Sequence, residues 1–184
     1  MPLGVLFLDL EREIEMIAMS AGKAGSLQEQ MNLFDAIHTN LRNLCLSPAG
    51  LAIGTADKKK VLIANTVVFL SGGIFKSKST AEVVFTATTH DIPANASTVQ
   101  EAMYLMTLAA DGTPTLTMGA ISSGAGTALL PERPATGTPI GAVRVAIAAG
   151  STIFDATTDE LDEAHITDTY YDFGYVGARF DAAQ

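Results

Sequence analysis

The sequence is poor in the residues that most often hold small domains together or carry catalysis. It contains one cysteine, no tryptophan and three histidines among 184 residues. Cys45 has no partner in the chain, which excludes a fold held by intrachain disulfides. Aromatic residues make up only 7%. A carbohydrate-binding or carbohydrate-cleaving groove built on exposed aromatics therefore ranks last among the functions considered.

Basic charge is also scarce. Eleven lysines and arginines stand against twenty acidic residues, which leaves a formal net charge of −9. A protein this acidic repels phosphate backbones and anionic membrane surfaces, so neither a nucleic acid nor a membrane is expected as a partner. The apolar first decade lacks a basic leader and is followed by Glu11, Glu13 and Glu15, so we expect mature protein made in a reducing cytoplasm.

Charge is unevenly distributed along the chain. Residues 51–90 hold five basic and two acidic residues, whereas residues 151–184 hold one basic and eight acidic. A basic middle segment and an acidic C-terminal segment would give the protein surface one positive and one negative region. Charged side chains on solvated loops are the simpler interpretation. The main basic run is Lys58, Lys59 and Lys60, with Lys76 and Lys78 following.

Motifs for nucleotide binding, serine hydrolysis and zinc proteolysis are missing. The histidines are widely spaced, and neither they nor Cys45 form a zinc-ligand pattern. An acidic cluster lacks the spacing of a calcium loop; its members are Asp155, Asp159, Glu160, Asp162, Glu163 and Asp168. We expect no catalytic residue, no cofactor and no metal site, and a buried thiol at Cys45 on a helix.

The chain opens with two predicted helices. The first, strongest over residues 8–19, repeats apolar side chains at helical spacing: Phe7, Leu10, Ile14 and Ile17. The second begins after Ser26, which with Glu29 has capping-box spacing, and is predicted to end at Pro48 and Gly50.

The second helix carries a short heptad pattern. The two series are Leu27, Phe34, Leu41 and Gln30, Ile37, Leu44. Such a stripe is typical both of a coiled-coil seam between subunits and of a helix packed on its own domain. Both interpretations stay open from the sequence.

After Pro48, threonine, glycine and β-branched residues dominate, and turn residues recur at short intervals. The Gly72-Gly73 and Asp111-Gly112 pairs mark turns, the second of them a hairpin. Strands are predicted over residues 61–70, 74–78, 82–89, 101–108, 113–119, 141–148, 151–154 and 166–171. No helical crossover separates these strands, which disfavours a parallel α/β fold. The prediction is a mainly β protein: an N-terminal α-helical arm over residues 1–50, then a jelly-roll-like β-sandwich domain over residues 51–184.

Several stretches of the β region resemble structural proteins of tailed bacteriophages. The clearest are Pro139-Ile-Gly-Ala-Val-Arg-Val145 after a proline loop, and the ending Thr167-Asp-Thr-Tyr-Tyr171. Residues 60–75, 130–134 and 153–154 add to the likeness, which spans about residues 58–173. Tail-fibre members of that group begin with a long attachment region. A short helical arm with one β domain is more similar to a capsid decoration, or cement, protein.

The resemblance implies a non-enzymatic virion protein on the outer capsid surface, made in the host cytoplasm. It further implies a homotrimer whose second partner is the major capsid protein. A tail, baseplate or fibre adaptor is the alternative. The residues expected at the oligomer or capsid interface are Phe7, Leu10, Ile14, Ile17, Leu27, Phe34, Ile37, Leu41, Leu44, Lys58, Lys59 and Lys60.

Overall fold

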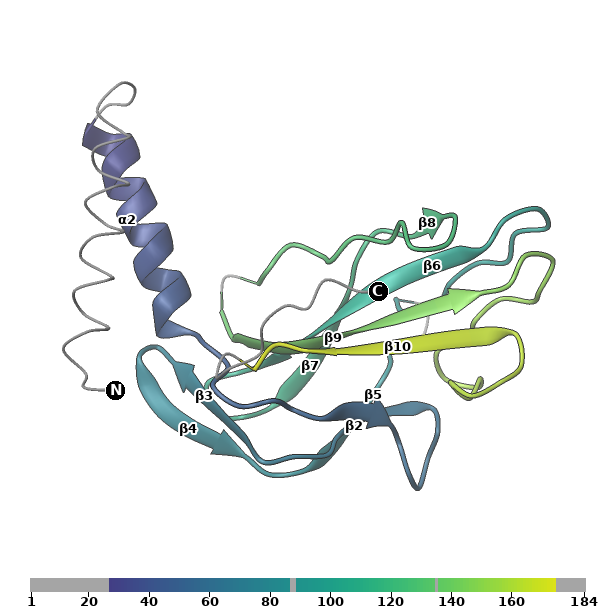
Figure 1. Cartoon of the computed structure of the whole chain (residues 1–184), viewed down its shortest axis with the longest axis horizontal. Coiled ribbons are helices and arrows are strands. Elements are labelled where there is room, and N and C mark those ends of the chain that lie inside the picture. Colours follow the sequence, from purple (N-terminus) through teal and green to yellow (C-terminus); the bar gives the residue numbers. More distant parts are fainter. Residues whose placement is uncertain (1–26, 87–88, 135, 175–184) are drawn as a thin grey trace. The chain divides into compact units, whose positions relative to one another are not determined.

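The computed structural model describes residues 27–86, 89–134 and 136–174 of the chain (Figure 1). The chain divides into two compact units, residues 1–41 and 42–184. Each unit is described by itself below. The first predicted helix, with Phe7, Leu10, Ile14 and Ile17, lies outside the described residues.

The second predicted helix forms but is shorter than expected. Helix α2 spans Leu27–Arg42 and ends six residues before Pro48. Beyond it the chain is extended and pairs with strand β3 (Val67–Ser71): Leu46 N–H donates to Val68 O at 2.8 Å, and Leu70 N–H donates to Leu44 O at 2.7 Å. The heptad assignment of Leu44 is therefore wrong, because backbone pairing with β3 replaces the last helical turn.

The largest sheet is antiparallel and has five strands. It contains β6 (Gln100–Leu108), β7 (Pro114–Met118), β8 (Ser122–Ser123), β9 (Thr138–Ile147) and β10 (Ile166–Asp172). The order is β10-β9-β6-β7, with β8 pairing beside β7 on the same edge of β6. The predicted hairpin at Asp111-Gly112 is confirmed: it joins β6 to β7, and Gly112 has a φ of 83°.

Two smaller antiparallel sheets complete the described strands, and the protein is mainly β. One sheet has the order β1-β2-β5, formed by Leu51–Ile53, Lys60–Ile63 and Ala81–Val84. The other pairs β3 with β4 (Ile74–Lys78). The strand predicted over 61–70 is in fact two strands. The predicted strand is interrupted where Asn65 N–H donates to Ala49 O at 3.0 Å, and its two halves enter different sheets.

One apolar cluster joins the sheets. Val61, Ile63 and Val83 from the small sheet contribute to the same core as Tyr104 and Val143 from the large sheet. Three of its aromatic rings, Phe85, Tyr104 and Phe154, meet edge to face, with the Phe85 centroid 5.0 Å from Tyr104 and 5.8 Å from Phe154. Edge-to-face contact is a favourable geometry for aromatic pairs. Every member of this cluster lies between residues 45 and 166, within the second unit.

The opposite face of β6 is covered as well, which explains why all nine of its residues are buried. Glu101 is completely buried there, and its Oε1 accepts hydrogen bonds from the N–H groups of Thr127 and Ala128, the latter at 2.6 Å. Arg144 on β9 lies with its Nε 3.7 Å from Glu101 Oε2. A carboxylate on the sheet thus anchors the loop that follows β8.

Two predicted strands are shorter than expected. Strand β5 ends at Val84, after which His90 N–H bonds back to Thr86 O at 3.2 Å. Of residues 151–154, only Phe154 pairs, in an isolated bridge with Ile92. Within the described part of the chain, no helix is both long and apolar enough to cross a membrane.

Candidate functional site

The β3–β4 hairpin ends in a tight two-residue turn. Ser71 pairs with Ile74 across the turn, and Gly72 and Gly73 have φ angles of 62° and 82°. Two consecutive positive φ angles are the requirement of the turn that best matches strand twist, and glycine meets it without steric cost. The Gly72-Gly73 turn expected from the sequence is confirmed.

Large apolar side chains are exposed at the end of this hairpin. Ile74 is 64% and Phe75 72% exposed. Successive side chains of a strand point to opposite faces, so Ile74 and Phe75 extend to opposite sides of the hairpin. Among the described strands, β4 pairs only with β3, and its outer edge is therefore open. We call Ile74, Phe75 and the Gly72-Gly73 turn the hairpin tip.

Strand β3, which pairs with the strand that carries the tip, is held firmly. Phe69 is fully buried and forms a bridge with Cys45. The Thr138 hydroxyl, itself buried, donates to Leu70 O at 2.6 Å. Because β3 is anchored, Ile74 and Phe75 are presented in a defined position, and less conformational entropy is lost when a partner binds them.

The predicted interface residues on α2 vary in exposure. Phe34 is 48% and Leu41 42% exposed, while Ile37 is half-buried. Leu27 is the first residue of the helix. Phe34 and Leu41 are seven residues apart, so they lie on one face of α2.

The basic run is largely compensated by carboxylates of the same chain. Lys58 pairs with Asp162, and Lys60 Nζ lies 3.2 Å from Asp57 Oδ2 and 3.5 Å from Glu82 Oε2. The hydrogen bond to Asp162 raises the pKa of Lys58 above its usual value. The positive middle and negative end of the chain therefore meet at the turn before β2, and Lys59 is the member of the run for which no ion pair is found among the described residues.

Cys45 is buried, as expected, but in extended chain rather than on a helix. Its Sγ donates to Ser47 O at 3.1 Å, and burial raises the pKa of the thiol to about 11. His90 is buried with its Nδ1 accepting from Thr86 N–H at 2.8 Å, while His165 lies beside Glu163 at 3.5 Å. In the acidic cluster, Asp155 accepts from both the N–H and hydroxyl of Thr157.

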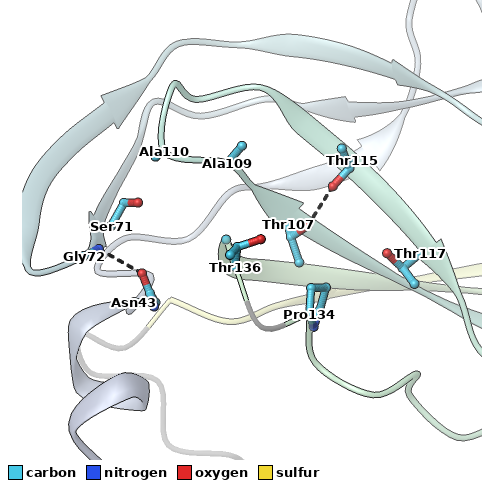
Figure 2. Close-up of a pocket in the computed structure, with 11 residues that line it drawn as sticks. Asn43, Ser71, Gly72, Thr107, Ala109, Ala110, Thr115, Thr117, Pro134 and Thr136 are labelled. Carbon is cyan, nitrogen blue, oxygen red and sulfur yellow. Dashed lines mark hydrogen bonds between the residues drawn. The ribbon is translucent and has the colours of Figure 1, made fainter.

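A cavity of about 600 Å³ lies close to the hairpin turn (Figure 2). Hydroxyl groups dominate its polar lining. Thr107 on β6 and Thr115 and Thr117 on β7 come from one face of the large sheet, and the hydroxyls of Thr107 and Thr115 lie 2.8 Å apart. The remaining lining residues are Asn43, Ser71, Gly72, Ala109, Ala110, Pro134, Thr136 and Gly137.

Three cations contact the main chain of residues that line this cavity. Arg42 donates from Nε and Nη2 to Gly72 O at 3.2 and 2.9 Å. Arg133 Nη2 donates to Asn43 O at 3.0 Å, and Lys76 Nζ donates to Ala110 O. These three side chains therefore brace the backbone around the cavity, while the lining itself carries no charged side chain among the described residues.

Comparison of the chain with protein-family models, with curated proteins and with solved structures found no match. Within the described ranges, no group of three His, Cys, Asp or Glu side chains is placed to hold a metal ion. The hairpin tip and the cavity are the two features of this region that carry recognisable binding chemistry. The tip had a sequence signal in the Gly-Gly turn beside Ile74-Phe75, whereas the cavity, built from residues 43 to 137, had none.

Proposed function

We propose that the protein is a non-enzymatic capsid decoration, or cement, protein of a tailed bacteriophage. It binds the outer surface of the head through contacts with the major capsid protein and stabilises the shell. The resemblance of residues 58–173 to phage structural proteins supports the class of protein. The exposed hairpin tip is the observation that supports the proposed mode of action, in which the protein acts by surface contact with the capsid.

The tip is suited to insertion into an apolar depression on a neighbouring subunit. Burying an exposed phenylalanine or isoleucine side chain contributes on the order of 1.5–3 kcal/mol. Aromatic anchors of this kind commonly provide most of the energy of a protein interface. Lys76 and Lys78, on the same strand, add basic charge that favours an acidic partner surface and speeds association.

The stabilising effect follows from mass action. A protein that binds the assembled shell, and not its separated subunits, shifts the equilibrium toward the shell. Many copies acting at once make a modest affinity per copy sufficient. No catalytic residue, cofactor or metal takes part in this proposal.

The oligomer is proposed to be a trimer with a jelly-roll-like sandwich domain and an N-terminal arm. The shared core of the large and small sheets supports the sandwich. Phe34 and Leu41 on one face of α2 support a role for the arm in association, either between copies or on the capsid. A tail, baseplate or fibre adaptor is the second candidate, because an exposed hairpin tip suits those interfaces equally.

The experiment that tests the proposal is a binding assay on purified phage heads and tails that lack the protein. Wild-type protein is expected to co-sediment with heads, and decorated heads are expected to release DNA at a higher temperature. The Phe75→Ser variant is expected to bind at least tenfold more weakly while unfolding at the same temperature, because Phe75 is 72% exposed and contributes little to the core.

Leu129→Ser is the matched control. Leu129 is 77% exposed and apolar but lies on the loop after β8, away from the hairpin in sequence. It is expected to bind like the wild type. Equal binding by Phe75→Ser would contradict the role of the tip, and binding to tails alone would favour the adaptor.

A further inference from the structure

The bonds of β3 determine which backbone groups β4 presents at its open edge. Leu70 N–H donates to Leu44 O at 2.7 Å, so the backbone of Leu70 faces away from β4. Leu70 lies directly opposite Phe75 in the hairpin. Opposed residues of an antiparallel pair either exchange both backbone bonds or exchange none, and these two exchange none. The N–H and C=O groups of Phe75 therefore point outward, to the open edge.

The same alternation places Ser77 beside Phe75 at this edge. Val68, which lies opposite Ser77, accepts from Leu46 N–H at 2.8 Å and so also faces away from β4. The intervening residues of β4 bond to β3 instead. Two N–H and two C=O groups, from Phe75 and Ser77, thus have no partner strand among the described residues, and both residues are exposed. Such an edge is a template for one more strand.

The two faces of β4 carry different side chains. Phe75 and Ser77 share one face, whereas Lys76 and Lys78 share the other. An added antiparallel strand places each of its residues opposite one residue of β4, on the same face of the sheet. An apolar residue is therefore favoured opposite Phe75, and an acidic residue is favoured opposite each lysine. The strand that fits this edge alternates apolar and acidic residues.

The two lysines differ in how far their charge is offset. Lys76 Nζ donates to Ala110 O, and the neighbouring Asp111 carboxylate offsets part of its charge. Lys78 lies beside Gly112, and no ion pair is found for it among the described residues. Lys78 is therefore the cation of this strand that most favours an acidic neighbour.

A second copy of β4 is a poor occupant of the same edge. Antiparallel pairing that uses Phe75 and Ser77 of both copies sets Phe75 opposite Ser77, and the two copies of Lys76 then lie opposite each other. Like charges directly opposite each other destabilise a pair of strands. Lysine on an edge strand is one of the means by which proteins prevent such self-pairing. The lysines thus select against a second copy and for an acidic strand.

We propose that β4 binds, by antiparallel strand addition, an extended segment of a partner protein in which apolar and acidic residues alternate. The inference rests on the proposed function, since it assigns that segment to the major capsid protein. It also deepens that proposal. Backbone pairing fixes the direction and register of the contact, whereas the side chains of the hairpin tip add apolar burial to it.

The probe is a blocked peptide of about seven residues in which valine and glutamate alternate, titrated into the full-length protein. Amide hydrogen exchange, followed by NMR, reports the pairing. Without peptide, the N–H groups of Lys76 and Lys78 are expected to be protected by β3, and those of Phe75 and Ser77 to exchange freely. With saturating peptide, exchange at Phe75 and Ser77 is expected to slow by about tenfold or more.

N-methylated peptides identify the edge in contact. Valines opposite Phe75 and Ser77 exchange backbone bonds with them, whereas the glutamate N–H groups point away from β4. Methylation of the valine nitrogens is expected to weaken binding by about tenfold or more, because it removes those donors. The matched control, methylated on the glutamate nitrogens, is expected to bind like the unmodified peptide. A peptide with lysine in place of glutamate is expected to bind about tenfold more weakly.

Two pairs of variants test the protein side. Ser77→Pro removes one outward N–H and keeps the bonds to β3, because proline is tolerated on an edge where its nitrogen faces outward. It is expected to bind the peptide about tenfold more weakly, whereas Ser77→Ala keeps the N–H and should bind like the wild type. Lys78→Glu is expected to reverse the preference between the glutamate and lysine peptides. Lys59→Glu makes the same charge change just before β2 and is expected not to reverse it.

The N-methylated peptides make their test on the unaltered protein, so the result does not depend on the folding of Ser77→Pro. Unchanged exchange at Phe75 and Ser77 would overturn the inference, as would equal binding of the two N-methylated peptides or of the glutamate and lysine peptides. Light scattering that shows loss of the oligomer in Ser77→Pro would assign the edge to a second copy, and would overturn it too.

Purified heads separate this inference from the proposed function. Ser77→Pro is expected to bind heads more weakly than Ser77→Ala. Heads that bind wild type and Ser77→Pro equally would refute strand addition and leave the shell contact standing. Pairing with the peptide, but no binding to heads, would refute the shell contact and leave strand addition at β4 standing.

Discussion

At the scale of single residues, Cys45 shows how burial and hydrogen bonding make a thiol inert. It is 4% exposed and donates to Ser47 O, and burial raises the pKa of the thiol to about 11. The reactive species is the thiolate, and at about pH 8 only about one thiol in a thousand is ionised at that pKa.

We therefore expect Cys45 to react with a thiol reagent at about pH 8 at least a hundredfold more slowly in the native protein than in urea. The measurement is the rate of colour development with a disulfide reagent in each condition. Comparable rates would show that the extended segment 44–46 opens readily from β3.

His90 carries the second prediction at this scale. Its side chain is buried, and burial lowers the pKa of the imidazole below its ordinary value of 6.5. Hydrogen bonding to Leu116 O and the charge of Asp91 oppose that shift without cancelling it. Because the folded pKa is the lower one, the unfolded chain takes up the proton first as the pH falls. The contribution of His90 to stability is thus complete above pH 6.5 and is lost as the pH falls below it.

We expect the free energy of unfolding to fall between about pH 7 and about pH 5, and the fall to be smaller in His90→Asn, which cannot titrate there. Urea unfolding at several pH values measures this. His38→Asn, which changes an exposed histidine on α2, is the control for the loss of one imidazole elsewhere. Identical curves for His90→Asn and the wild type would mean that His90 does not titrate on unfolding in this range.

At the scale of elements, Glu101 links β6 to the loop after β8. Burial raises the pKa of its carboxyl, but hydrogen bonds from the N–H groups of Ala128, Gly126 and Thr127, together with Arg144, outweigh burial and hold the pKa below its usual value. The carboxylate is therefore ionised in the folded protein at neutral pH. Removing it leaves backbone donors and a partly buried guanidinium without their partner.

We expect Glu101→Ala to lower the free energy of unfolding by about 3 kcal/mol, because breaking a buried charge pair from one side is costly. Urea unfolding gives the value, and hydrogen exchange should show loss of protection at Thr127 and Ala128. The double variant Glu101→Leu with Arg144→Leu should lose less than the sum of its two single variants. Additive losses would rule out coupling between the two side chains.

Gly141 on β9 marks a close approach between elements. A Cβ atom there would lie 2.4 Å from Leu51 Cδ1 on β1 and 2.5 Å from Tyr171 O on β10. The leucine tip can move, but the carbonyl belongs to a paired strand and cannot move without disturbing the ladder. The absence of a side chain at this position lets β1 pack against β9 and β10.

We expect Gly141→Ala to destabilise the protein by about 2 kcal/mol, the usual cost of overpacking a well-packed core. Denaturant unfolding measures it. In the double variant Gly141→Ala with Leu51→Ala, the added methyl group still clashes with Tyr171 O. The double variant should therefore be less stable than Gly141→Ala alone. A Gly141→Ala variant as stable as the wild type would show that β10 can shift at no cost.

At the scale of the whole molecule, the second unit contains a complete core. Among the described residues, its buried cluster runs from Cys45 to Ile166 and takes no member from residues 27–41. A domain with its own core is expected to fold without the segment before it.

We expect a chain of residues 42–184 to unfold cooperatively in urea with nearly the same midpoint as the full-length protein. Light scattering on both chains then tests the arm: full-length protein should have about three times the 19.2 kDa chain mass, and the shortened chain should be a monomer if α2 joins the copies. A shortened chain that fails to fold would contradict the independence of the second unit.

Local patterns predicted much of this architecture. The hairpins at Gly72-Gly73 and Asp111-Gly112, and strand β4 with its residues 74–78, followed from turn chemistry and alternation. Two of the errors lie where long-range backbone bonds override local preference. Asn65 bonds to Ala49 and splits one predicted strand, and Leu44 bonds to Leu70 and ends α2 early.

The sequence by itself determined the mainly β class and the turn residues, because each of these depends on neighbours within a few positions. Only the tertiary structure decided which charges are compensated, since Lys58 meets Asp162 across more than a hundred residues. It also decided where Glu101 is buried and which threonines share a cavity. The physical reason is that the periodicity of side chains along a strand determines which residues share a face of the sheet. Strand order and register determine which other residues that face contacts.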